Sequence, residues 1–117
     1  MKKAIMVVGF ARVKEILDAG ILAWEKDPNN ENPADLSGHG STFSWATKAA
    51  LLAAFGHGKQ LVQPEVIGDG SGAKANLIVD LRTGLNGPAS RMPKSGPWIP
   101  DSQVQEIEDW INAGCPD

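Results

Sequence analysis

A chain of 117 residues is long enough to form one domain with its own hydrophobic core. Hydrophobic residues make up 42% of it and charged residues 21%, a balance that is typical of globular proteins and excludes a disordered chain. The net charge is −3 and lysine and arginine form no local cluster, so we expect no nucleic-acid partner.

Residues 1–9 combine two lysines with a short apolar run. They are either an N-terminal extension of the domain or a leader peptide. We favour the extension, because charged residues follow from Arg12 onwards without a cleavage signal. No run of 18 apolar residues occurs in the sequence, so we expect a soluble protein without a membrane span and leave its compartment open.

Residues 10–25 have the period of an amphipathic helix, because apolar side chains recur at steps of three and four. The stripe consists of Phe10, Val13, Leu17, Ile21 and Trp24, with Ile16 and Gly20 beside them. Residues 27–38 are polar and contain two prolines and three asparagines, which predicts a loop.

A second helix is predicted over residues 45–55, where alanine is frequent and Gly56 follows as a stop signal. Its candidate N-caps are Ser41, Thr42 and Ser44. Residues 57–72 are rich in glycine but lack a phosphate-binding motif, so we interpret them as irregular structure. Residues 73–81 fit either a strand or a short helix, since their apolar triplet favours a strand and their flanks favour a helix.

The last helix is predicted over residues 102–113, after a loop that is rich in proline and glycine. Its buried face consists of Val104, Ile107, Trp110 and Ile111. Asp101 or Ser102 is expected to cap its start, and Gly114 followed by Pro116 is expected to end it. Together these elements predict an all-α fold of three to five short helices joined by long Gly/Pro-rich loops.

Cys115 is the only cysteine, so the chain has neither an intramolecular disulfide nor a metal site made of cysteines alone. Its place beside Pro116 near the C-terminus predicts an exposed or half-exposed thiol. We interpret it as a tolerated free cysteine, with a redox or dimer-forming role as the alternative.

Met92-Pro93 is followed by Ile99-Pro100-Asp101-Ser102-Gln103-Val104 and then by Trp110-Ile111-Asn112-Ala113-Gly114-Cys115-Pro116. This order resembles the C-terminal part of small bacterial c-type cytochrome domains. Ile16-Leu17 stands where that family has an Ile-Leu pair before its haem-attachment sequence. The resemblance implies one cytochrome c-like domain over residues 1–117. It also implies a periplasmic or secreted origin, since the family works mainly outside the cytoplasm.

The haem-attachment sequence of the family is missing. Where Cys-x-x-Cys-His would stand, the chain has Ile21-Leu22-Ala23-Trp24-Glu25, without a thiol or an imidazole. Covalent attachment needs both thiols and the adjacent ligand, so we predict no cofactor and no covalently bound haem. Met92 matches the family's distal haem ligand. Without that haem, we interpret it as a buried and adaptable core residue.

A haem-shaped space would lower stability unless something filled it. Side chains are the simplest filling, and the residues expected to line the space or a ligand pocket there are Trp24, His39, Phe43, Trp45, Met92 and Trp98. Arg91, Lys94 and Trp98 also form a basic and aromatic set before the last helix. We interpret this set as a solvated rim, with contact to an anion or a partner as the alternative.

The only histidines, His39 and His57, each lie between two glycines and are the candidate metal ligands. The carboxylates that such a site would need are Asp35, Glu65 and Asp69. We predict no metal, because isolated histidines at loop and helix ends more often cap helices or face solvent.

No catalytic motif is present, and three hypotheses remain. We favour a haem-free cytochrome c-like module that binds an unknown protein or small molecule or has a structural role. The first alternative is an electron carrier that holds haem non-covalently through Met92 and a histidine. The second is a small metal-dependent enzyme that uses His39, His57 or both.

Overall fold

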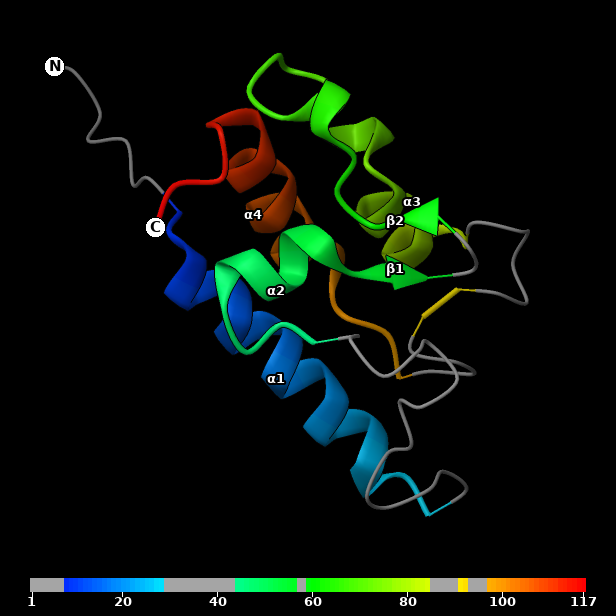
Figure 1. Ribbon diagram of the computed structural model, residues 1–117. Helices are drawn as coiled ribbons and strands as arrows, with labels where there is room; N and C mark the ends of the chain where they lie inside the picture. The colour runs from blue at the N-terminus through cyan, green and yellow to red at the C-terminus, as the bar shows by residue number, and fades with distance from the viewer. Residues whose placement is uncertain (1–7, 29–43, 57–58, 85–90, 93–96) are drawn as a thin grey trace, which may run out of the picture.

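The computed structural model describes residues 8–28, 44–56, 59–84, 91–92 and 97–117. These residues are mostly helical, as the sequence predicts (Figure 1). The α-helices are α1 (Phe10–Lys26), α2 (Lys48–Ala53), α3 (Asn76–Arg82) and α4 (Asp101–Asn112). The short elements are the 3-10 turns η2 (Pro64–Val66) and η3 (Gly72–Lys74) and the antiparallel strands β1 (Phe55–Gly56) and β2 (Lys59–Gln60).

Helix α4 is the centre of the fold, because it contacts α1, α3 and η3. Its predicted apolar face is confirmed, since all four of its predicted residues are buried. Trp110 is the largest of them and has no exposed surface. Its ring centroid lies 6.1 Å from that of Phe10 on α1, and its indole nitrogen donates a hydrogen bond of 2.7 Å to the Pro116 oxygen. Trp110 therefore joins α1, α4 and the C-terminal tail.

Helix α1 runs along the predicted stripe and ends one residue later than expected. Burial is concentrated in its first half, at Val13, Ile16 and Leu17. On its polar side, both nitrogens Nε and Nη2 of Arg12 bind the two carboxylate oxygens of Glu106 on α4, each at 2.9 Å. This hydrogen bonding lowers the pKa of Glu106, although partial burial opposes the effect.

Helix α2 is shorter than the predicted span of 45–55, so that prediction is corrected at both ends. It begins after Thr47, whose Oγ1 accepts a hydrogen bond of 3.1 Å from the Ala50 amide. Ser44 instead accepts a bond of 3.0 Å from the Ala46 amide and caps no helix. Phe55 belongs to β1. The other two expected caps, Ser41 and Thr42, lie outside the described residues.

The ambiguous segment 73–81 resolves into the end of η3 and most of α3. The element η3 approaches α4 closely at Gly72, which is buried. Its amide donates a hydrogen bond of 2.7 Å to the side-chain oxygen of Asn112. A Cβ atom at Gly72 would lie 2.8 Å from that same oxygen and from the main-chain oxygen of Glu108, so this contact requires glycine.

The start of α4 differs from the prediction that Asp101 or Ser102 caps it. Pro100 holds the N-cap position, and no side chain there accepts a capping hydrogen bond. Asp101 is the first helical residue, and its carboxylate accepts a bond of 2.8 Å from Nε of Arg82 on α3. The negative charge still favours the helix through its position in the first turn.

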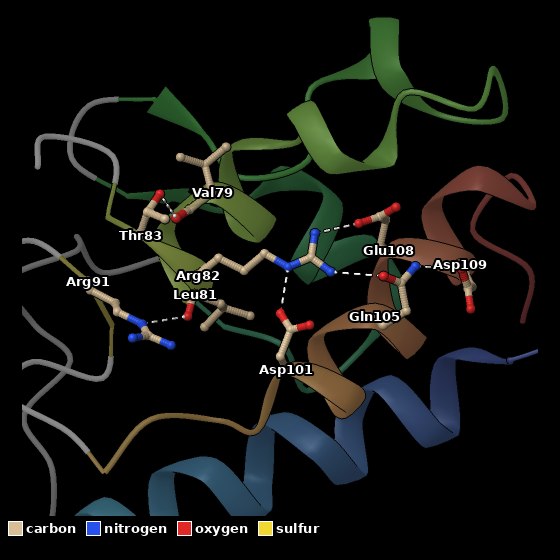
Figure 2. A network of polar contacts seen from close by, with 9 residues as sticks. All are labelled: Val79, Leu81, Arg82, Thr83, Arg91, Asp101, Gln105, Glu108 and Asp109. Carbon is tan, nitrogen blue, oxygen red and sulfur yellow. Dashed lines mark hydrogen bonds and ion pairs between the residues drawn. The ribbon is translucent and has the colours of Figure 1, made fainter. Parts of the chain in front are cut away.

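Arg82 connects α3 to α4 through three acceptors (Figure 2). Besides Asp101, it donates to Glu108 at 2.5 Å and to Gln105 at 3.1 Å, and Gln105 donates in turn to Asp109 at 3.0 Å. Burial lowers the pKa of Arg82, but the bonds to Glu108 and Asp101 raise it by more, so the net shift is upward. The guanidinium thus acts as a fixed fork between the two helices.

Helix α4 ends as predicted at Gly114, which has a φ of +96°. The Gly114 amide donates to the Ile111 oxygen at 3.0 Å, and the Cys115 amide donates to the Trp110 oxygen at 2.9 Å. This pair of bonds is a Schellman motif, which turns the chain back on the helix. Lys48 on α2 donates to the Cys115 oxygen at 3.2 Å and also pairs with Asp117.

The Schellman motif overturns the prediction of an exposed or half-exposed thiol, because it folds the tail inwards. Cys115 is only 3% exposed and belongs to the hydrophobic core. Burial raises the pKa of its thiol, and the nearby charge of Lys48 offsets this only in part. The thiolate is therefore scarce at neutral pH, and reagents in solvent cannot reach it in the native state.

We expect Ellman's reagent to label Cys115 at least about 100-fold more slowly in the native protein than in a denaturant, because labelling needs local opening of the tail. The rate is measured by absorbance at neutral pH. The variant Gly114→Val should label faster, since valine strains the left-handed turn that buries the thiol. Equal rates in native and denatured protein would contradict this burial.

Candidate functional site

The segment between α3 and α4 brings two of the predicted surface residues together. The guanidinium carbon of Arg91 lies 4.2 Å from the ring centroid of Trp98, which is a cation–π contact. The indole is 45% exposed, so the stacked pair faces solvent. We call these two side chains the Arg91/Trp98 pair. Their contact was not predictable from spacing, because seven positions and a Pro/Gly-rich loop separate them.

The cationic side of the pair is fixed to the end of α3. Arg91 donates through Nε to the main-chain oxygen of Leu81 at 3.1 Å, as Figure 2 shows. The next amide, that of Met92, donates to the main-chain oxygen of Asp80 at 3.0 Å. Two consecutive residues are thus held by the last turn of α3, and this limits the rotation of the guanidinium.

The aromatic side of the pair is fixed to α1. Ile99, next to Trp98, is buried, and it packs against α1 at Gly20. A Cβ atom at Gly20 would lie 2.8 Å from Cγ1 of Ile99, so the loop approaches the helix as closely as a glycine permits. Trp98 therefore projects from a loop that has a buried anchor on one side.

Arg91 differs from the other two arginines of the chain in its partners. Arg12 pairs with Glu15 and Glu106, and Arg82 pairs with Asp101 and Glu108. Within the described ranges, Arg91 has no carboxylate partner and makes one hydrogen bond, through Nε. Its two terminal nitrogens therefore have donors that no described residue uses.

Three other residues of the predicted pocket, namely Met92, Trp45 and Trp24, lie in the described part of the chain. Met92, which the sequence analysis interprets as a buried core residue, is half-buried and packs against the hydrophobic core. Trp45 also packs against the core, and its indole nitrogen donates to Asp18 on α1 at 2.7 Å. Hydrogen bonds from Lys14 and then from Trp45 lower the pKa of Asp18 against the effect of burial. Trp24 is half-buried near the end of α1.

Three of the five candidate metal ligands lie outside the described residues, namely His39, His57 and Asp35. Two further candidate site residues also lie outside them, the pocket residue Phe43 and the basic residue Lys94. The remaining two candidates, Glu65 and Asp69, are exposed, and Asp69 accepts a bond of 2.9 Å from the Ser71 amide. Among the side chains that the structure places, no three of the types His, Cys, Asp and Glu are grouped to hold a metal ion.

Sequence reasoning missed Asp80, a carboxylate that is only 5% exposed. Aspartate is almost never buried unless it is paired, so its residue type alone does not indicate a buried position. The signal that could have found it is its position, since it interrupts the apolar run Leu77-Ile78-Val79 and Leu81. Its main-chain oxygen helps to position the residue after Arg91.

The described helices include none that is long and apolar enough to cross a membrane. Comparisons of the chain with protein-family models, with curated proteins and with solved structures found no match.

Proposed function

We propose that this protein is a haem-free cytochrome c-like module that binds a partner. The observation that carries the proposal is the solvent-facing Arg91/Trp98 pair. It is attached to α3 through main-chain hydrogen bonds and to α1 through a buried isoleucine. Tryptophan and arginine are the residues most often found at the energetic centres of protein interfaces.

The haem-free part of the proposal rests on α1 and on Met92. Helix α1 continues without a break through residues 21–25, where the family would carry its attachment sequence, and these residues offer no thiol and no imidazole. Met92, the residue that matches the distal ligand, packs against core side chains. A thioether committed to packing is a weak candidate for an axial ligand.

Haem titration tests this proposal. We expect the purified protein to show no Soret band, and we expect no six-coordinate spectrum when haem is added. The variant Met92→Ala should leave the titration unchanged, with Met6→Ala as the matched control. A stoichiometric Soret band in the purified protein would contradict the proposal. A six-coordinate spectrum that only Met92→Ala alters would favour the electron carrier instead.

A further inference from the structure

The Arg91/Trp98 pair has the features of a preorganised acceptor for one oxyanion. The contact with the indole face and the bond from Nε to the Leu81 oxygen both restrain the guanidinium. No described residue accepts a hydrogen bond from the two terminal nitrogens, and a planar fork of this kind matches the two oxygens of a carboxylate. Because the side chain is already held, a ligand would cost it little further conformational entropy.

We propose that the Arg91/Trp98 pair recognises a carboxylate side chain on an extended segment of a partner protein. An apolar neighbour of that carboxylate would lie on the exposed part of the Trp98 ring. This inference rests on the proposed function, because it names the chemistry of the partner that the module would bind.

The surrounding charges favour a protein carboxylate over a polyanion. Nucleic acids and anionic membranes bind to several cations at once, and the chain carries a net charge of −3. The cations Arg12, Lys14, Lys48 and Arg82 already pair with carboxylates. Among the residues that the structure describes, Arg91 is the cation in contact with the exposed indole, and this arrangement suits a single carboxylate.

The proposal is tested with two peptides that differ only in a carboxylate against a carboxamide. They are an acetylated and amidated hexapeptide with Leu-Glu at its centre and the same peptide with Leu-Gln. Binding is followed by the indole N–H resonance of Trp98, which is assigned with Trp98→Phe. We expect a saturable shift with the Glu peptide and an affinity roughly 10-fold lower for the Gln peptide, since the charge-assisted bonds are lost.

Variants identify the residue responsible. Arg91→Gln should reduce the affinity for the Glu peptide to that for the Gln peptide, and Arg91→Lys should restore it only in part, because lysine lacks the fork. Lys59→Gln, which removes an exposed cation from β2, should have no effect. Thermal unfolding of each variant confirms that it folds.

Several results would overturn the inference. If both peptides bound equally well and Trp98→Ala abolished the binding, recognition of a carboxylate would be refuted. Binding of a partner at this face would still be supported. If neither peptide bound, the inference would be refuted. The haem titration would still test separately whether the module is haem-free. The Trp98 resonance could also shift more with inorganic phosphate or with anionic phosphatidylserine vesicles than with the Glu peptide. This result would show that the pair recognises a phosphate group and not a protein carboxylate.

Discussion

Replacing Trp110 by alanine is expected to lower the free energy of unfolding by about 3–5 kcal/mol. The side chain is fully buried, and its removal leaves a cavity where α1, α4 and the tail meet. It also leaves the Pro116 oxygen without its donor. Since small domains are stable by only about 5–15 kcal/mol, much of the stability would be lost. Urea unfolding followed by circular dichroism measures the change.

Two controls divide this effect into its causes. Trp110→Phe keeps most of the volume and loses the hydrogen bond, so its cost should be clearly smaller than that of alanine. Trp98→Ala removes an exposed tryptophan and should cost about 1 kcal/mol or less. If Trp98→Ala destabilised the protein as much as Trp110→Ala, the assignment of Trp110 as the central core residue would be wrong.

Replacing Arg82 by methionine is expected to destabilise the fold by about 1–3 kcal/mol. This is more than a surface ion pair contributes, because the side chains of Arg82 and Glu108 are only 24% and 16% exposed. Without the guanidinium, Glu108 loses its cation and three acceptors on α4 lose their shared donor. Thermal and urea unfolding of the variant measure the loss.

The lysine variant separates charge from geometry at the same position. Arg82→Lys keeps the positive charge but cannot reach Asp101, Gln105 and Glu108 together, so we expect it to recover only part of the stability. A matched variant, Lys74→Met, removes an exposed cation from η3 and should change the stability little. Full recovery with lysine would mean that charge alone, and not the fork, holds α3 to α4.

Elements with a regular apolar period could be predicted from the sequence. The stripe of α1 and the four buried residues of α4 come directly from such periods, and the predicted bounds of both helices lie within one residue of the observed ones. Gly114 ends α4 as expected, because a residue with positive φ is needed there. The mostly helical fold follows from the same patterns.

Features set by partners distant in sequence could not be predicted. Asp101 would have been an ordinary cap, but Arg82, 19 positions earlier, binds its carboxylate. Trp45 was expected to begin a helix, but its indole bonds to Asp18, and the helix begins after Thr47. Cys115 was expected near solvent, but it is buried, and Lys48 on α2, 67 positions earlier, donates to its main-chain oxygen.

The candidate site was predictable as a set of residues but not as a geometry. Arg91 and Trp98 were recognisable as a basic and aromatic set, with a solvated rim as the preferred interpretation. Their stacking depends on main-chain oxygens of α3 and on the anchoring of Ile99, neither of which leaves a pattern in the sequence. The pocket that was expected to include His39 and Phe43 stays a prediction, because both lie outside the described residues.

The close approach of Gly20 to Ile99 links position 20 on α1 to the packing of the residue next to Trp98. A larger residue there would displace the end of the Ile99 side chain, because a Cβ atom at position 20 would lie 2.8 Å from Cγ1 and 2.9 Å from Cδ1 of Ile99. Under the proposed function, a substitution on α1 would therefore alter the packing next to Trp98 while both side chains of the Arg91/Trp98 pair stay unchanged. The residue type at position 20 would thus affect how the loop that carries Trp98 and Ile99 packs on α1.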